Sequence, residues 1–331
     1  MGLTRSVTTP VNDVGSALYR AAQYATLAPS FLNTQPWRWR VGAEGLDLFA
    51  DLDRAVTSVD PDRRLLTISC GAALHHACVA LRAEGLTPEI QRCPDAGCSE
   101  HLASITIADE HPATPAEVEL AHAIEARRSE RRSFSAGKRV APSDVDLLRR
   151  RATLYGALLH QVSDDQRRFL ATAVRSAAAI EGRQEPYQSE LRSWTDLRRS
   201  GEGVVATDLA NRARPVAVPD STTSPGRVHA AFGEDRDAEY LILATRDDMA
   251  TDWLRAGEAL SAAWLTAITQ GIAGSVLTNL SEVPGARALI ASLLPEPGQP
   301  QVVLRIGIPT WPAPAATPRR RPETMITVET P

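Results

Sequence analysis

A short pattern occurs twice in the 331-residue chain, once in each half. Each copy has a small residue, glycine, any residue, alanine and leucine, then an apolar helical stretch that ends at a second glycine and an aliphatic residue. The two glycines are fourteen residues apart in both copies, Gly71 to Gly85 and Gly257 to Gly271. Any two helices that end in glycine resemble each other, but the equal spacing favours duplication. A duplicated chain would imitate a homodimer within one polypeptide.

The periodicity of the apolar residues predicts an α+β chain, in which helices alternate with pairs of strands. Helices are expected at 14–26, 65–84, 116–132 and 251–270, with helical patterns dominating 141–200, and strands as a pair within 36–52, as a pair around 94–100, and at 240–245, 275–278 and 301–308.

Residues 109–117 contain two prolines and read as a linker. We therefore expect an N-terminal half over residues 1–112 and a C-terminal half over residues 113–331. The polar stretch 201–236 shows weak periodicity, and long segments of this kind are often functional lids. A lid within residues 180–236 is accordingly expected.

Charge and composition narrow the possible partners. The net charge of −4 and the aromatic content of 5% argue against a nucleic-acid partner. No apolar run approaches the roughly 18 residues that a membrane-spanning helix needs, so no membrane partner is expected. Four cysteines without metal or redox spacing, and no evident signal peptide, predict reduced structural thiols in a cytoplasmic protein.

Several well-known sites are absent from the sequence. It lacks the glycine-rich dinucleotide fingerprint, the P-loop, the zincin motif and the nucleophile elbow of serine hydrolases. His75 and His76 are neighbours on an expected helix and point in different directions, so we expect surface or partly buried side chains and no metal site.

The segment 28–37 joins a helix to a strand and carries small polar side chains. Ser30, Asn33 and Gln35 offer hydrogen-bond donors and acceptors beside Trp37. A capped turn is the alternative interpretation, but such a turn would need only the proline and the asparagine.

Arginines form two clusters, at 127–132 and at 319–321. The planar guanidinium suits a phosphate through paired, charge-assisted hydrogen bonds. A solvated basic face at the end of a helix is an equally good interpretation of the first cluster.

Together these segments resemble the FMN-dependent nitroreductases. The matching segments are Pro29-Ser30-x-x-Asn33-x-Gln35-Pro36-Trp37, Arg127-Arg128-Ser129-x-Arg131, Gly274-Ser275-Val276, and Arg305-Ile-Gly307-Ile-Pro309 followed by Pro318-Arg319-Arg320. The order of the first two is changed, because the Q-P-W loop lies in the first half and the R-R-S turn in the second. That arrangement, over nearly the whole chain, is similar to the Acg family of mycobacteria and other actinobacteria, whose members are fused, pseudo-dimeric nitroreductase relatives.

The resemblance implies a nitroreductase-like α+β fold with mixed, mainly antiparallel sheets surrounded by helices. Two tandem related halves would mimic the nitroreductase homodimer, so that the protein is a monomer with internal pseudo-two-fold symmetry. One FMN is implied between the halves, since the second half has no Q-P-W loop and the first has no R-R-S turn.

The resemblance also assigns residues to the flavin. Pro29, Ser30 and Asn33, with Gln35 in the same loop, would contact FMN from the first half. From the second half, Arg127, Ser129, Arg319 and Arg320 would hold the phosphate, Arg128 the ribityl chain, and Arg131 the pyrimidine edge of the ring. Gly274, Ser275 and Val276 would lie near the ring.

The activity implied by the resemblance is hydride transfer from NAD(P)H through FMN to a small-molecule electron acceptor such as a nitroaromatic or a quinone. The cofactor carries this chemistry, so no catalytic side chain is predicted. The alternative is a protein that binds or sequesters FMN in a closed pocket with little turnover. A weaker alternative is an oxidase or dehydrogenase of a biosynthetic intermediate, since the fold supports several activities.

Overall fold

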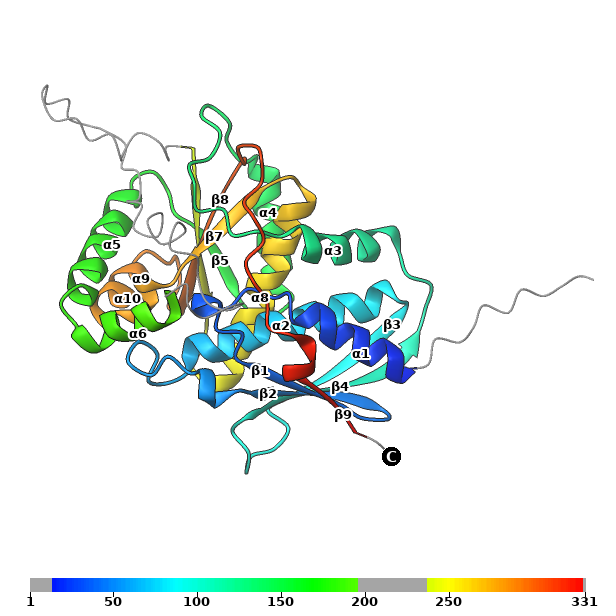
Figure 1. Ribbon diagram of the computed structural model, residues 1–331. Coiled ribbons are helices and arrows are strands. Elements are labelled where there is room, and N and C mark those ends of the chain that lie inside the picture. Colours follow the sequence, from blue (N-terminus) through cyan, green and yellow to red (C-terminus); the bar gives the residue numbers. More distant parts are fainter. Residues whose placement is uncertain (1–13, 196–236, 330–331) are drawn as a thin grey trace, which may run out of the picture.

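The computed structural model of the chain describes residues 14–195 and 237–329 (Figure 1). In the first half the described elements are α1 (Val14–Ala25), η1 (Phe31–Asn33), β1 (Trp37–Val41), β2 (Gly45–Ala50), η2 (Leu52–Arg54), α2 (Arg64–Ala83), β3 (Leu86–Arg92) and β4 (His101–Glu110).

The second half carries more elements. They are α3 (Pro115–Ala126), α4 (Pro142–Thr153), β5 (Leu158–Gln161), α5 (Arg167–Glu181), α6 (Glu185–Thr195), β6 (Glu239–Thr245), α8 (Ala250–Thr269), β7 (Ala273–Leu277), α9 (Asn279–Glu282), α10 (Pro284–Ala291), β8 (Gln299–Gly307), η3 (Pro322–Thr324) and β9 (Ile326–Val328).

The two sheets have the same topology. One has the strand order β3-β4-β2-β1-β9 and the other the order β7-β8-β6-β5. In each half a helix is followed by two strands, a long central helix and two more strands, and these four strands pair antiparallel. The expected α+β fold, with two related halves and mainly antiparallel sheets, is confirmed.

The two long central helices, α2 and α8, cross between the sheets (Figure 1). Their crossing point is the repeated glycine. A Cβ atom on Gly71 would lie 2.0 Å from the carbonyl oxygen of Leu254, and one on Gly257 would lie 2.0 Å from that of Ile68. Each contact therefore mirrors the other, as in an interface between two identical subunits. Only glycine allows the two backbones to approach so closely.

The ends of α2 and α8 are also alike. Gly85 and Gly271 have positive φ angles of 82° and 71°, directly after the last helical turn. Glycine adopts this left-handed conformation without a Cβ clash and is the common residue at this position. The glycine that closes each copy of the sequence repeat is therefore a helix terminator.

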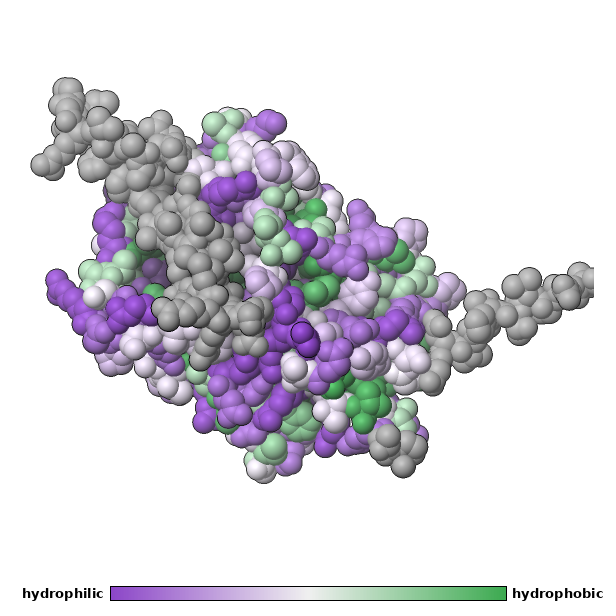
Figure 2. Space-filling view, viewed as in Figure 1, coloured by the Kyte–Doolittle hydropathy of each residue, from purple (hydrophilic) through white to green (hydrophobic). Residues whose placement is uncertain are grey.

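Helix α2 lies in the core of the molecule. Among the described helices it has the length and apolar composition of a membrane span, so the statement that no apolar run approaches this length is wrong. Its most apolar window is wholly buried inside the fold, which explains the composition by packing against α1 and α8. Hydrophilic residues dominate the molecular face in Figure 2, where apolar residues form small separate patches.

Two sequence-based expectations for the second half need correction, and a third concerns residues that are only partly described. The helix expected at 116–132 ends at Ala126, because the chain turns there to lay residues 127–131 against β7. The helical region 141–200 contains strand β5, a four-residue element too short to show a period. The expected lid lies partly outside the described residues, and its described part forms the end of α5 and helix α6.

The histidines and the C-terminal tail also differ from expectation. His75 and His76 are both buried, because α2 is covered on all sides by helices and a sheet. After β8 the chain passes from the second sheet to the first, where β9 pairs parallel with β1 and Trp39 lies opposite Ile326. The expected division of the chain at residues 112 and 113 stays a prediction.

We expect the Gly71→Ala substitution to destabilise the protein by about 3 kcal/mol, because the new methyl group overlaps the backbone of α8 and forces the crossing helices apart. Chemical denaturation measures this change. Gly285→Ala in α10 is the matched control, since a Cβ there meets nothing within 4 Å. It should be neutral or stabilise by about 0.5–1 kcal/mol. Equal effects of the two substitutions would show that the crossing is not tightly packed.

Candidate functional site

The loop between α1 and β1 has an unusual backbone. Leu32, Asn33 and Gln35 all have φ angles near +50°, a region that non-glycine residues rarely adopt. Hydrogen bonds hold it in place. The Ser30 hydroxyl accepts from the backbone N–H of Gln35 at 2.9 Å, and the Ser69 hydroxyl accepts from the N–H of Phe31 at 3.0 Å. Strain of this kind, fixed by neighbouring groups, is typical of functional loops.

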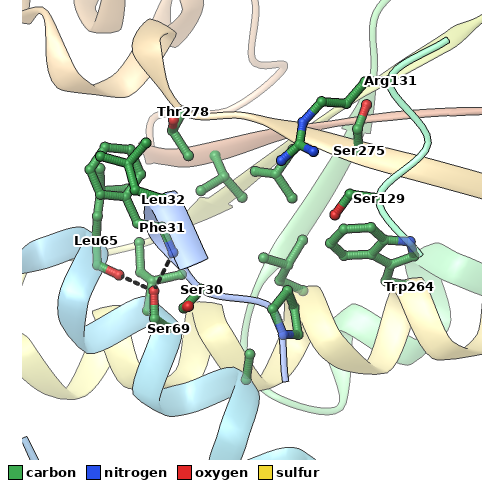
Figure 3. Close-up of a pocket in the computed structure, with 16 residues that line it drawn as sticks. Ser30, Phe31, Leu32, Leu65, Ser69, Ser129, Arg131, Trp264, Ser275 and Thr278 are labelled. Atoms are coloured by element: carbon green, nitrogen blue, oxygen red, sulfur yellow. Dashed lines mark hydrogen bonds between the residues drawn. The ribbon is translucent and has the colours of Figure 1, made fainter. Parts of the chain in front are cut away.

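This loop forms one wall of a pocket between the two halves (Figure 3). Ser30, Phe31 and Leu32 approach from one side, and Ser129, Arg131 and Trp264 lie on the other. The pocket holds about 680 Å³ of space, counting the part open to solvent, which is within the range of small-molecule and cofactor sites. The remaining lining residues are Pro29, Leu65, Ile68, Ser69, Ala72, Leu260, Ser275, Val276, Thr278 and Val302.

A second, basic pocket adjoins the first. Four arginines line it, together with residues of the C-terminal tail: Leu27, Ile124, Glu125, Arg127, Arg128, Ser129, Arg131, Ala315, Ala316, Thr317 and Arg319. Ser129 and Arg131 line both pockets, so the two form one composite site with an apolar part and a cationic part.

Arg127 is the most constrained cation of the site. Its side chain is 5% exposed and its guanidinium lies over the Trp264 ring, 4.9 Å from the ring centre. The Nη2 atom has a long contact of 3.5 Å to the carbonyl oxygen of Leu27, whereas Nε and Nη1 are buried without a hydrogen-bond partner among the described residues. Buried guanidinium groups are normally paired, because burial of an unpaired charge is costly.

Burial and the neighbouring arginines lower two pKa values in this pocket. The pKa of Arg127 falls to about 9, first because of burial and then because of Arg319, Arg128 and Arg131. Burial and Arg128 lower the pKa of Arg319 to about 10. Both shifts arise first from burial and then from repulsion among the cations, and an anion in the pocket would offset the repulsion. The composite site therefore suits a ligand with an apolar body and an anionic group.

The structure brings nine of the thirteen predicted residues to the pocket walls. Pro29, Ser30, Ser129, Arg131, Ser275 and Val276 line the apolar part, and Arg127, Arg128 and Arg319, with Ser129 and Arg131, line the basic part. Asn33, Gln35, Gly274 and Arg320 do not line either part; they lie behind the walls.

Asn33 and Gln35 attach the loop to the C-terminal tail. Asn33 accepts from Arg319 at 2.8 Å and donates to the carbonyl oxygen of Pro318 at 3.0 Å. The side-chain oxygen of Gln35 accepts from the backbone N–H of Arg320 at 2.8 Å. Arg320 itself bonds to the Gln35 carbonyl and lies 3.2 Å from a carboxylate oxygen of Asp51, so its charge is already balanced.

Gly274 positions the turn that carries Ser129. The two residues form a parallel bridge, and the Gly274 carbonyl accepts from the N–H of Glu130 at 2.8 Å. A Cβ on Gly274 would lie 3.1 Å from the Arg305 carbonyl oxygen and 3.3 Å from Nε1 of Trp264. Glycine thus lets the turn, β7 and the indole pack together.

Sequence reasoning missed the residues that form the apolar walls. Trp264 was placed on a helix without a role, and Phe31, Leu32 and Ser69 were not named as lining residues. A partial signal existed, because Phe31 and Leu32 lie inside the recognised loop. Trp264 and Ser69 reach the site only through the crossing of α2 and α8, which no local pattern encodes.

The fold and site define a two-halved α+β protein with a composite pocket that has an apolar part and a cationic part. No protein-family model matches the chain. Two Mycobacterium tuberculosis proteins are similar over most of its length. One, named "Putative NAD(P)H nitroreductase", is 39% identical over 89% of this chain and 87% of its own. The other, named "Putative NAD(P)H nitroreductase acg", is 34% identical over 91% and 92%.

The chain therefore belongs to the Acg-type family of NAD(P)H nitroreductase-like proteins, and the resemblance seen in the sequence is confirmed. Among solved structures, a nitroreductase of Bacteroides fragilis with bound FMN matches 64% of this chain and 99% of its own, with 16% identity and a TM-score of 0.41. A nitroreductase-annotated protein of Anabaena variabilis matches 91% and 90%, with 10% identity and a TM-score of 0.47.

We expect the Arg127→Met substitution to stabilise the ligand-free protein by about 1 kcal/mol or more, because it removes a buried, unpaired cation. Thermal denaturation measures the effect. Inorganic phosphate should stabilise the wild type and not the variant. Arg150→Met is the control, since Arg150 is an exposed residue of α4 that lines neither part of the composite pocket; it should bring no stabilisation. A loss of stability in Arg127→Met would contradict the assignment of an uncompensated charge.

Proposed function

We propose that the chain binds one FMN in the composite pocket and transfers hydride from NAD(P)H to a small electrophile such as a nitroaromatic or a quinone. The observation that carries this proposal is the buried Arg127 guanidinium, which lacks an anion partner among the described residues and lies at the basic end of a pocket with apolar walls. The names of the related proteins, which include NAD(P)H nitroreductase, support the same activity.

The residues fit the phosphate of FMN. Arg127, Arg319 and the Ser129 hydroxyl would hold it by charge-assisted hydrogen bonds. Arg128 and Arg131 add positive charge around the same space. The anion would offset the repulsion that lowers the pKa values of Arg127 and Arg319, so binding and local stability are coupled.

The apolar part fits a flat ring system. Pro29, Leu32 and Val276 present apolar atoms, while Ser30 and Ser275 add hydroxyl groups near them. When bound there, FMN supplies the hydride acceptor and donor. The pocket walls would orient the ring and shield it from water, and the Arg131 cation, which lines the same pocket, would stabilise negative charge on the reduced ring.

The residues on the opposite side of the helix crossing support a single flavin for each chain. The sequence repeat aligns Ala72 and Thr278, which line the apolar pocket, with Glu258 and Arg92. Glu258 and Arg92 form a two-bond ion pair, with nitrogen–oxygen distances of 2.7 and 2.9 Å and a fully buried carboxylate. Side chains thus fill the mirror position. This supports a pseudo-dimeric monomer with one working site.

A flavin-sequestering protein remains the second candidate, and helix α6 is the observation that favours it. Glu190 of α6 accepts from the backbone N–H groups of Thr57 and Ser58 at 3.0 and 2.8 Å. Trp194 packs in the same apolar cluster as Phe31 and Leu32. Helix α6, the described part of the expected lid, therefore packs against the loop that lines the pocket.

Anaerobic stopped-flow absorbance distinguishes the two candidates. We expect the FMN-loaded protein to lose its visible flavin absorbance on mixing with NADH or NADPH, at a rate that saturates with the nicotinamide. Arg131→Met should lower that rate by about 10- to 100-fold, because it removes a cation near the developing charge. Arg150→Met, an exposed residue of α4, is the control.

A flavin that dithionite reduces and nicotinamides do not would favour sequestration. A purified protein that is colourless and does not bind added FMN would contradict both candidates.

A further inference from the structure

A third cavity lies beyond the crossing of the central helices. The C-terminal half of α2, helices α3 and α8, strand β3 and the end of α4 enclose it. It holds about 1260 Å³ of space, counting the part open to solvent, and is thus larger than either part of the composite pocket.

This cavity is separate from the proposed flavin site. Ala262 and Thr266 of α8 line the cavity, whereas Leu260 and Trp264 line the apolar pocket. Residues two positions apart on a helix are about 200° apart around its axis. The two sites therefore lie on opposite faces of α8.

By the sequence repeat, this cavity corresponds to one side of the proposed flavin pocket, with the roles of the two halves exchanged. The sequence repeat aligns Ile90 and Arg92 of β3 with Val276 and Thr278, which line the apolar pocket. The same two strand positions line the third cavity. The duplicated half thus keeps an open space beside this strand, although the Arg92–Glu258 ion pair fills the position that mirrors Ala72 and Thr278.

Arginine side chains give this cavity a positive wall. Arg82 lies near the Tyr155 hydroxyl, and Arg151, at the end of α4, lines the same cavity. No carboxylate forms an ion pair with Arg82 or Arg151 among the described residues. The carboxylate of Glu117 also lines the cavity and caps α3 by accepting from the N–H and hydroxyl of Thr114, both at 2.8 Å. Arg82 lies near this carboxylate and near Glu258, so these two side chains offset part of its charge, whereas Arg151 adds positive charge at the rim.

Aromatic and apolar groups complete the walls. The His75 and Tyr155 rings are packed edge to face, with their centres 5.2 Å apart. Nδ1 of His75 lies 2.8 Å from the Ser261 hydroxyl oxygen. Burial, with Arg82 and Arg151, lowers the pKa of His75 to about 3, so the imidazole is neutral and the arginines alone supply positive charge. Val79, Leu120 and Leu154 provide aliphatic surface.

We propose that this cavity is a second ligand site, selective for a small organic monoanion with a flat apolar body, such as an aromatic carboxylate. The carboxylate would pair with Arg82 and Arg151, while the body would lie against Tyr155 and the aliphatic wall. A compact, strongly hydrated anion such as inorganic phosphate lacks the apolar surface that this wall would bury. The site does not depend on the flavin, because no residue of its wall lines the composite pocket.

Isothermal titration calorimetry of the protein as purified tests this proposal with three probes. Benzoate should bind saturably with one site for each chain. Benzamide, its neutral analogue, should bind at least about tenfold more weakly, because it lacks the charge that the arginines recognise. Inorganic phosphate should not compete with benzoate.

Arginine substitutions locate the binding. The double variant Arg82→Met/Arg151→Met should weaken benzoate binding by about tenfold or more, and Arg151→Met alone, at an exposed position, should weaken it with the fold intact. Arg150→Met, the neighbouring exposed arginine outside the cavity, should bind like the wild type. No saturable benzoate binding, or binding that the double variant leaves unchanged, would overturn the proposal.

Discussion

The close contact of Gly71 and Gly257 is the constraint on which the rest of the molecule depends. With no side chain between them, the backbones of α2 and α8 are in direct contact where the two helices cross. This crossing brings the loop of the first half, at Ser30, against the turn of the second half, at Ser129. Neither half alone contains both walls of the pocket. A larger residue at the crossing would change the spacing of the site as well as the packing of the core.

Two arginines on opposite sides of the helix crossing have opposite surroundings, although the sequence repeat aligns Arg92 with Thr278 and not with Arg127. On one side a buried cation, Arg127, has no carboxylate partner among the described residues and is repelled by other arginines. On the other side Arg92 is matched by the buried carboxylate of Glu258. A buried charge without a partner lowers the stability of the protein and can bind an oppositely charged ligand. A buried charge in an ion pair has its partner already and only fills space.

Much of the architecture could be predicted from the sequence, because glycine, proline and the apolar period act locally. The repeat around Gly71 and Gly257 indicated two related halves, and the strands and long helices were found near their observed bounds. Elements that depend on distant partners were missed. Strand β9 has three residues and exists through its pairing with β1. Trp264 is part of the site through a helix crossing. The Arg127 turn was read as a helix because its pairing with β7 is not encoded in any periodicity.

The parallel pairing of β9 with β1 has a consequence for the order in which the chain folds. The two strands are separated by nearly the whole described sequence, and every element of the second half lies between them. Contacts between such distant segments form late, since closing a long loop is entropically unfavourable. During synthesis, β1 is therefore an unpaired edge of the first sheet until β9 has been made. The contacts of Asn33 with Pro318 and of Gln35 with Arg320 form in the same late step, so the pocket is completed only after this segment has reached the first half.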